Sequence, residues 1–323
     1  MPDAFVWVGG LSAAAGVGTW GALHYALRGN LMDQPGDRRS HTVATPRGGG
    51  IAIVLVVLLA GAYLATRREP VDAMWLGFLP GLLIVSGIGW WDDHRPLSPW
   101  LRLAVQAVAA LMLALGVGWQ SGQWLPAVAA FAAAMVLVNV WNFMDGINGL
   151  AASQAALAAL SYAVLLTGEW HGLALALLAG CLGFLPFNFP RARIFLGDVG
   201  SGALGYILAA LATAGAVQLP SAKVPLLLLP LGVFLVDAGF TLSGRILRGE
   251  QWWTPHVSHL YQVMARRIGH TAVTVIYIAF GGVSLLLSYV WTPASHFTAV
   301  CVVAALYVAG GALWVLLRRG WRG

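Results

Sequence analysis

Asparagine and aspartate side chains interrupt a long apolar region of the sequence. In NVWNFMDGINGL (residues 139–150), Asn139, Asn142 and Asp145 recur every third residue. If a helix continues through Asp145, this spacing stacks the three side chains on one face. Amide and carboxylate groups arranged in this way suit a nucleobase, a sugar or a metal-bound water. A polar ladder that joins helices is the alternative, but an ionisable Asp at membrane depth favours a functional site.

Two adjacent acids end another apolar stretch, in GWWDDHRPLSPW (residues 89–100). Neighbouring carboxylates repel each other, so Asp92 and Asp93 are both ionised only near a cation or in full solvent. The pair therefore indicates magnesium binding or a general base. A solvated helix end is the alternative.

A glycine-rich turn with an acid follows in FNFPRARIFLGDVGSGALGY (residues 187–206). Gly197 and Asp198 lead into an expected helix, whose amino-terminal N–H groups favour an anion. Asp198 suits magnesium, which typically takes one or two carboxylates together with phosphate oxygens. It is an equally good N-cap candidate. Arg193, five residues earlier, adds a cation to the same segment.

Basic groups gather in DQPGDRRSHTVATPRGGGIAI (residues 33–53), where Arg39 and His41 are candidate phosphate ligands. The alternative is that these arginines only set the membrane orientation and that the three following glycines serve packing.

The last polar segment is DAGFTLSGRILRGEQWWTPHVSHLYQ (residues 237–262). His256 and His259 are three residues apart, which on a helix places both on one face, where they would bind phosphate, shuttle protons or ligate zinc. Zinc is disfavoured because no third ligand of the usual kind lies nearby. Arg245 is a further candidate for binding an anion. Asp237 falls inside an apolar span and is expected to pair with a group on another helix.

Membrane helices must position these residues. Of the 323 residues, 59% are hydrophobic and 9% are charged, with a mean hydropathy of +0.78; soluble domains are about half apolar and a quarter charged. Eleven stretches are long enough to cross about 30 Å of hydrocarbon as helix. They cover residues 5–27, 49–66, 74–91, 100–117, 125–141, 150–167, 171–187, 202–217, 224–244, 272–291 and 297–317. We predict an all-α integral membrane protein with 10 or 11 transmembrane helices and catalytic cytoplasmic loops.

Basic residues near the ends of membrane helices remain in the cytoplasm. With the amino terminus outside, 15 of the 18 Lys and Arg residues fall on inner loops, and only Arg67, Arg68 and Lys223 fall outside. The opening Met-Pro-Asp has no basic segment, so the first span is expected to be a retained helix rather than a signal peptide. In this topology all five polar segments meet on the inner face, which indicates one cytoplasmic site.

No segment outside the spans is long enough for a soluble domain, so residues 1–323 are expected to form a single polytopic membrane domain. The net charge of +6 is explained by anionic lipid and a phosphate substrate, and no nucleic-acid partner is expected. The two cysteines, Cys181 and Cys301, fall within spans and form no metal-binding pattern.

Together the five segments resemble the polyprenyl-phosphate N-acetylhexosamine-1-phosphate transferase superfamily, of the glycosyltransferase family 4 type. This superfamily includes the muramoyl-pentapeptide translocase of peptidoglycan synthesis. The matching segments, in order over about residues 33–262, are DQPGDRRSHTVATPRGGG, the DD pair, NFMDGINGLA, PRARIFLGDVGSG and HVSHLYQ. The first helix and the last two match by hydropathy alone.

The resemblance implies transfer of a sugar 1-phosphate from a UDP-sugar to undecaprenyl phosphate, with release of UMP and dependence on Mg²⁺, which Mn²⁺ can replace. It implies a bacterial inner-membrane protein with a periplasmic amino terminus, and a cytoplasmic carboxyl terminus and active site. A homodimer is also expected. The implied metal ligands are Asp198 and Asp93, and the implied catalytic residues are Asp92, Asp93, Asp145, His256 and His259. The implied substrate contacts are Arg39, His41, Asn139, Asn142, Asn148, Arg193, Phe195, Gly197 and Arg245, with Phe195 at an aromatic position suggested to stack on uracil.

Charge considerations agree with this chemistry. Attack by one phosphate on another brings anions together, so a metal and several Arg or His groups must neutralise the developing charge. A base is less necessary, because the second pKa of a phosphate monoester is about 6. We therefore expect Asp92 or Asp93 to act through the metal and through positioning rather than by removing a proton.

Two positions depart from the pattern of some family branches. Asn148 and Pro96 stand where those branches carry acids. The Asn148 pattern is more similar to the branch that initiates O-antigen or capsule synthesis. The expected donor is then a UDP-N-acetylhexosamine, either the GlcNAc form or a 6-deoxy form such as N-acetylfucosamine. The competing hypotheses are a secondary transporter, disfavoured because its polar site would lie at the bilayer midplane, and an inactive scaffold of a glycan assembly complex.

Overall fold

The computed structural model describes residues 3–34, 43–67, 71–251, 254 and 257–320. Twelve α-helices and one 3-10 helix account for most of this part of the chain. They are α1 (Ala4–Arg28), α2 (Ile51–Ala65), α3 (Ala73–His94), α4 (Pro99–Ser121), α5 (Trp124–Phe143), α6 (Leu150–Leu165), α7 (Gly168–Asn188), α8 (Asp198–Gln218), η1 (Ser221–Leu231), α9 (Gly232–Leu247), α10 (Leu260–Ile268), α11 (His270–Val290) and α12 (His296–Gly320). Two short strands, β1 (Met32–Asp33) and β2 (Thr45–Pro46), pair antiparallel before α2.

The all-α membrane architecture expected from hydropathy is confirmed. In the described chain, nine helical segments are long and apolar enough to cross a membrane, with η1 and α9 counted as one, and α2 and α6 are shorter apolar helices. These eleven elements correspond one to one with the eleven predicted stretches. Only α10, which is short and amphipathic, has no counterpart among those stretches.

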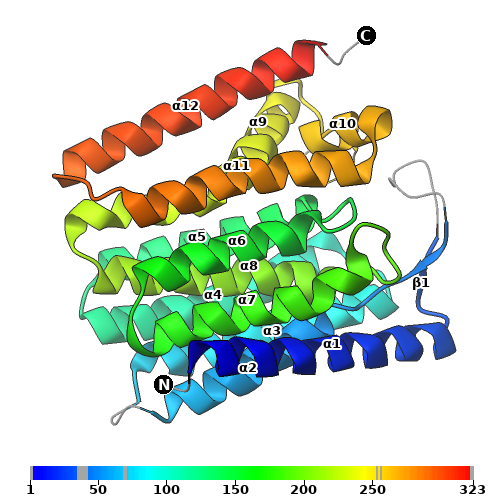
Figure 1. The fold of residues 1–323 in the computed structure, drawn as a ribbon, viewed down its shortest axis with the longest axis horizontal. Helices are drawn as coiled ribbons and strands as arrows, with labels where there is room; N and C mark the ends of the chain where they lie inside the picture. The colour runs from blue at the N-terminus through cyan, green and yellow to red at the C-terminus, as the bar shows by residue number, and fades with distance from the viewer. Residues whose placement is uncertain (1–2, 35–42, 68–70, 252–253, 255–256, 321–323) are drawn as a thin grey trace.

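Most of the long helices lie side by side with similar axis directions, and α9 is steeply inclined to them (Figure 1). Helix α8 runs through the interior and is buried along nearly its whole length, whereas α1 and α12 lie at opposite edges of the bundle. Small residues let the central helices approach closely, as is common in membranes. A Cβ atom at Gly205 would lie 2.2 Å from the carbonyl oxygen of Leu137 on α5, so only glycine fits where α5 and α8 meet.

The carboxyl-terminal helices are tied together by one buried acid, Asp237 of α9. Its carboxylate accepts hydrogen bonds from the backbone N–H groups of Leu260 (2.8 Å) and Tyr261 (3.1 Å) at the start of α10. It also accepts from the Tyr277 hydroxyl (2.8 Å) on α11 and the Trp314 indole (3.0 Å) on α12. The expectation that Asp237 pairs with other helices is confirmed.

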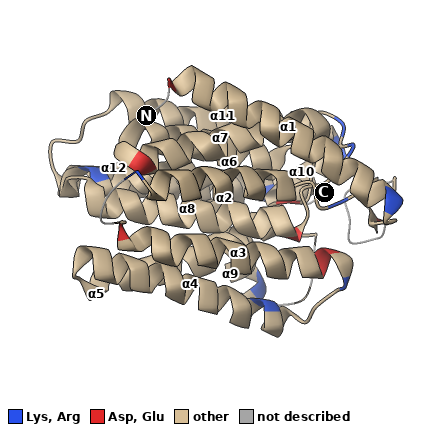
Figure 2. Ribbon diagram, turned by 90° about the horizontal axis from the view of Figure 1, so that it is seen from below, with Lys and Arg blue, Asp and Glu red and all other residues tan. Residues whose placement is uncertain are grey.

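Charged residues lie mostly at the two ends of the helices, and the middle of the bundle is almost free of them (Figure 2). Helix α1 begins at one end of the bundle and α12 finishes at the other (Figure 1). The turns between α3 and α4, α5 and α6, and α7 and α8 lie at the end where α12 finishes, and they carry most of the polar segments described above.

Candidate active site

One cavity of about 450 Å³ lies at this end of the bundle. It is bounded by α3, α4, α5 and α8 and by the segments before α2 and α10. Eight of the predicted site residues line it: Asp93, Asn139, Asn142, Asp145, Phe195, Gly197, Asp198 and His259. These eight come from four of the five polar segments, and Asp33 and Arg47 of the fifth segment line the same cavity, so all five meet around one volume, as the topology argument predicts.

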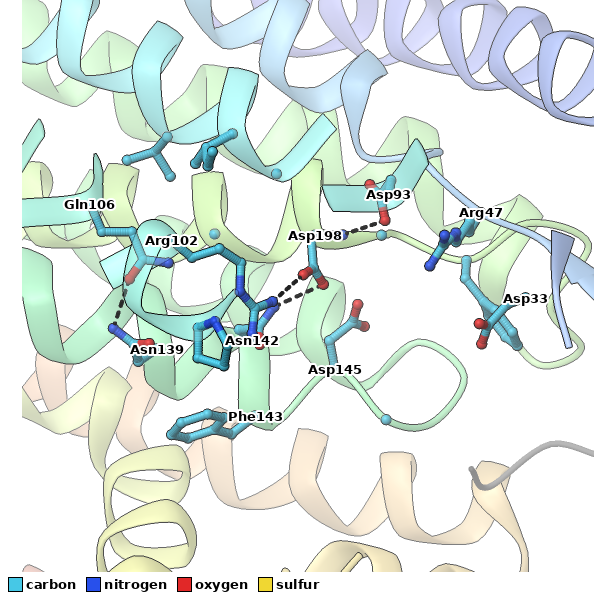
Figure 3. Close-up of a pocket in the computed structure, with 18 of the residues that line it drawn as sticks. Asp33, Arg47, Asp93, Arg102, Gln106, Asn139, Asn142, Phe143, Asp145 and Asp198 are labelled. Atoms are coloured by element: carbon cyan, nitrogen blue, oxygen red, sulfur yellow. Dashed lines mark hydrogen bonds and ion pairs between the residues drawn. The ribbon is translucent and has the colours of Figure 1, made fainter. Parts of the chain in front are cut away.

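Asp198 lies at the centre of the polar contacts in this cavity (Figure 3). Its carboxylate accepts one hydrogen bond from the Arg102 guanidinium, at 2.8 Å, and one from the Asn142 side-chain amide, at 2.9 Å. The N-cap alternative for Asp198 is wrong, because Asp198 is the first residue of α8 and Gly197 occupies the cap position. The side chain is consequently directed into the cavity instead of back onto its own helix.

Asp93 takes the place of the anion expected at the start of α8. One of its oxygens accepts from the backbone N–H of Asp198 at 3.0 Å, and the other accepts from that of Val199 at 3.1 Å. The side chain is buried. The helix dipole and the unpaired N–H groups of α8 thus stabilise a carboxylate of the protein itself. The hypothesis that these N–H groups hold a substrate anion is wrong for the first two of them.

Glycines at two positions make this close contact between α3 and α8 possible. Gly197 has a φ of +77°, and a Cβ atom there would lie 2.6 Å from a carboxylate oxygen of Asp93. At Gly89 on α3 a Cβ atom would lie 2.4 Å from the carbonyl oxygen of Asp198. Any larger residue at either position would push α3 away from the start of α8.

Arg102 joins two acids through a single nitrogen. Its Nη1 atom lies 2.7 Å from Asp92 and 2.8 Å from Asp198, and the second Asp92 oxygen accepts from the backbone N–H of Leu97 at 2.6 Å. In the sequence Arg102 was interpreted only as a signal of orientation, and its place in the site was missed. The sequence did carry a signal for this role. Arg102 lies four residues after Ser98, which caps α4, and four residues before Gln106, so Arg102 and Gln106 share one face of that helix.

The asparagine and aspartate series is not a continuous helical face. Helix α5 ends at Phe143, so Asp145 lies in the following turn, and the condition for one face shared by all three residues is not met. Asn142 still reaches Asp198, and the Asn139 amide donates to the Gln106 side chain at 3.1 Å. Asn139 and Asn142 therefore line the cavity from one face of α5, whereas the turn after α5 places Asp145 there.

Asp145 lies outside the spans in a strongly perturbing electrostatic environment. Burial raises the pKa of its carboxyl group well above the usual range, and the charges of Asp198 and Asp93 raise it further. Figure 3 shows the Asp145 carboxylate pointing into the same space as that of Asp198. The cavity therefore holds more negative charge than its own arginines neutralise.

His259 reaches the cavity from the opposite wall. It is the N-cap residue of α10, which begins at Leu260, so His259 itself is not within a helix. Burial lowers the pKa of the His259 imidazole, against the influence of Asp237, and nearby arginines lower it further. A neutral imidazole donates a hydrogen bond but supplies no positive charge. His256 lies outside the described residues, as do Arg39 and His41.

Three predicted substrate contacts do not line the cavity. Asn148 donates to the carbonyl of Pro190 at 3.1 Å. Arg193 is directed along the surface, with its guanidinium carbon 4.6 Å from the centre of the Phe187 ring. Arg245 is buried and hydrogen-bonds the segment before α10, including the carbonyl of Gln251 at 3.0 Å. These three residues shape the surrounding loops.

Several polar residues that line the cavity were not identified as site candidates from the sequence. Tyr261 is buried and donates through its hydroxyl to the carbonyl of Phe143 at 2.9 Å, linking α10 to the turn that carries Asp145. Arg47 precedes the three glycines and was counted only as a topological signal. The others are Asp33, Gln106, Asn188, Thr254 and Gln262. Arg47 had a recognisable signal, because a cation beside a glycine run is typical of phosphate binding.

Comparison with known proteins identifies the family. Residues 75–216 match the model of glycosyl transferase family 4. The chain is 31% identical to decaprenyl-phosphate N-acetylglucosaminephosphotransferase of Mycobacterium tuberculosis, over 91% of this chain and 84% of that protein. It is 30% identical to a probable undecaprenyl-phosphate N-acetylglucosaminyl 1-phosphate transferase of Bacillus subtilis, over 78% of this chain and 75% of the relative.

The peptidoglycan branch is also similar. Phospho-N-acetylmuramoyl-pentapeptide-transferase of Moorella thermoacetica is 35% identical over 65% of this chain and 74% of its own length. The likeness to the mycobacterial enzyme extends over almost the whole chain and is not confined to the motif segments. The chain therefore belongs to the polyprenyl-phosphate N-acetylhexosamine-1-phosphate transferase superfamily, within glycosyl transferase family 4, as its motifs predict.

Proposed function

We propose that this membrane protein transfers N-acetylhexosamine 1-phosphate from a UDP-sugar to undecaprenyl phosphate and releases UMP. The new bond joins an oxygen of the lipid phosphate to the phosphorus that bears the sugar, and the bond from that phosphorus to UMP breaks. The observation that carries the proposal is the meeting of Asp198, Asp145, Arg102 and Arg47 in one cavity at the end of the bundle. The proposed reaction requires that a charged donor from water and a charged lipid headgroup both reach that position.

The acids of this cavity fit a magnesium ion. Within the described ranges, no three His, Cys, Asp or Glu side chains are grouped closely enough to hold a metal on protein ligands alone. Magnesium usually needs only one or two carboxylates, because waters and substrate phosphates complete its shell. Asp198 and Asp92 are the pair we assign to it, because one oxygen of each is directed toward the same Arg102 nitrogen, and Asp145 adds a further acid to the cavity. Manganese would substitute at the same ligands.

The bound ion would neutralise charge on the reacting phosphates. Asp93 was the second predicted ligand, but both of its oxygens accept N–H groups of α8. We therefore assign Asp93 to holding Asp198 in place. Arg102 and Arg47 are suited to contact phosphate oxygens, since guanidinium groups bind them well. Asn142 orients the Asp198 carboxylate.

Phe195 and His259 complete the proposed substrate contacts. Phe195 lines the cavity, and its proposed role, stacking on uracil, rests on the family resemblance. His259 donates to a diphosphate oxygen as a neutral imidazole. No base is assigned to the lipid phosphate, which is already largely ionised near neutral pH.

UDP-N-acetylglucosamine is the donor we propose, because the Mycobacterium tuberculosis and Bacillus subtilis relatives are named for N-acetylglucosamine. The 6-deoxy donor with N-acetylfucosamine is the alternative that the Asn148 pattern suggests. The reaction would be the first membrane step of a cell-surface polysaccharide, such as O-antigen, on the cytoplasmic face of the inner membrane.

Radiolabel transfer tests the proposal directly. Purified protein in detergent is mixed with undecaprenyl phosphate and each of a panel of labelled UDP-sugars, with Mg²⁺, Mn²⁺ or EDTA. We expect a lipid-extractable product and an equal amount of UMP with one donor in Mg²⁺, and neither in EDTA. Asp198→Asn should lower the rate about 10²- to 10³-fold, as loss of a preorganised electrostatic contact does elsewhere.

The matched control is Asp72→Asn, which changes an acid that caps α3 at the other end of that helix. This variant should keep most of the transfer rate. Absence of lipid-linked product with every donor would contradict the proposal and leave the transporter or scaffold hypothesis. Full activity in EDTA would refute the magnesium assignment alone.

A further inference from the structure

We propose that the Arg102 guanidinium and a divalent cation compete for the same two carboxylates, those of Asp92 and Asp198. The inference rests on the magnesium-dependent transfer proposed above. In this inference Arg102 is a positioning residue. It keeps the two carboxylates directed toward one point, and it must release Asp198 when the cation binds.

The contacts define that point. A single nitrogen, Nη1 of Arg102, lies 2.7 Å from one Asp92 oxygen and 2.8 Å from one Asp198 oxygen. The other oxygen of each acid is held by a neutral donor, the backbone N–H of Leu97 for Asp92 and the Asn142 amide for Asp198. Both carboxylates therefore direct their second oxygen toward the same place. Two oxygens of this kind are the ligands that a hard divalent cation selects.

The arginine is the partner able to move. Asp92 is in the last turn of α3 and Asp198 is the first residue of α8, and the backbone of Asp198 is itself bound to Asp93. The helix ends thus hold both acids. Arg102 reaches them on a flexible side chain that keeps 30% of its surface exposed, so its guanidinium can turn aside while the acids remain in place.

Release of Asp198 gives Arg102 a second role. Figure 3 shows the guanidinium beside Asn142 and Asp198, on the cavity wall formed by α4 and α5. A guanidinium displaced from Asp198 stays within this cavity, where the proposed substrates bring phosphate oxygens. Entry of the cation and binding of phosphate by Arg102 would then be coupled, because both require the same ion pair to break.

Cation binding without substrate tests the competition. Free Mn²⁺ is measured by electron paramagnetic resonance during titration of wild-type protein, Arg102→Gln, Arg102→Met and Arg47→Gln in detergent. Loss of a competing ligand should tighten Mn²⁺ binding about tenfold in both Arg102 variants, within the usual range of coupling between ligands. Arg47→Gln removes a charge from the same cavity and should change the affinity less than about threefold, because Arg47 has no such bridge to remove.

Each outcome has a distinct meaning. Equal tightening in the Arg47 and Arg102 variants would show a general charge effect and overturn the proposal. Unchanged or weaker Mn²⁺ binding in the Arg102 variants would overturn it as well. Their elution volume and helical circular dichroism must match wild type, and misfolding would weaken binding, so it cannot imitate the expected result.

The substrate reaction separates this inference from the proposed function. If wild-type protein bound no Mn²⁺ with or without UDP-N-acetylglucosamine, the metal assignment would fail together with the competition. If wild-type protein bound Mn²⁺ and formed product, but the Arg102 variants bound Mn²⁺ no more tightly, only the competition would fail. With the competition correct, Arg102→Gln combines tighter Mn²⁺ binding with a lower kcat, a combination that a purely structural role does not produce.

Discussion

At the scale of single residues, the site is defined by charge that the protein leaves partly unneutralised. Asp145, Asp93 and Asp198 share one cavity, and the pKa of Asp145 is raised by burial and by the two other acids. Such an arrangement costs folding stability, and the cation proposed above would offset that cost. The cost itself can be measured.

Replacing Asp145 by Asn should therefore stabilise the protein in EDTA. The folded pKa of Asp145 is raised above the unfolded value near 3.9, so between these two values the folded state binds more protons. Its destabilising contribution then grows as the pH rises and is complete above the folded pKa. We expect the Tm of Asp145→Asn to exceed that of wild type by about 2–4 °C at pH 8, the effect of roughly 1 kcal/mol.

The gain should vanish below about pH 3, where Asp145 is protonated in both the folded and the unfolded state. Added Mg²⁺ should raise the Tm of wild type more than that of the variant. A variant less stable than wild type at pH 8 would contradict the interpretation. Asp72→Asn provides the control for a change of acid outside the cavity, because Asp72 caps α3 at its other end.

At the scale of elements, the separation of α3 from α8 decides where Asp198 lies. Gly89 on α3 faces the Asp198 backbone so closely that a Cβ atom would lie 2.4 Å from its carbonyl oxygen. Gly87, two residues earlier, has no atom within 4 Å of such a Cβ. The same helix thus offers both a test position and a control.

Gly89→Ala should lower both stability and transfer rate. Overpacking of this kind typically costs about 1–3 kcal/mol, and displacement of the α8 start should reduce the rate at least about tenfold, since small misplacements of catalytic groups are expensive. Gly87→Ala should retain the rate and gain slightly in Tm, because alanine favours helix over glycine. The readouts are the Tm and the transfer assay, and equal effects of the two substitutions would count against the close contact.

At the scale of the whole molecule, the charge distribution predicts which end of the bundle faces the cytoplasm. The cavity and the end of α12 lie at one end, and α1 begins at the other (Figure 1). The excess of arginine in the loops at the cavity end predicts that this end is cytoplasmic. A soluble nucleotide sugar, made inside the cell, would require the same orientation.

Labelling of single cysteines tests this orientation. With Cys181 and Cys301 replaced by alanine, one cysteine is placed at Arg95, beside the cavity end, or at Ser121, at the far end of α4. In intact spheroplasts a membrane-impermeant maleimide should label the cysteine at 121 and leave the one at 95 unlabelled until the cells are lysed. The opposite pattern would reverse the predicted topology without affecting the site geometry.

The sequence alone determined the membrane architecture, because the thickness of the bilayer imposes a length and composition that each span carries locally. All eleven predicted stretches became helices. The polar segments also contain most of the residues around the cavity, since charged groups in so apolar a chain are costly wherever they have no partner. The family assignment followed from the order of those segments.

The tertiary structure alone decided which group each polar residue contacts. Asp93 caps a helix that begins 105 residues later in the chain, and Arg102 joins an acid of α3 to one of α8. Asn148, Arg193 and Arg245 were predicted to bind substrate but hydrogen-bond or pack against loops. No local pattern encodes these pairings, because a hydrogen bond depends on the distance and direction between two atoms. Here that distance and direction are determined by how helices far apart in the sequence pack together.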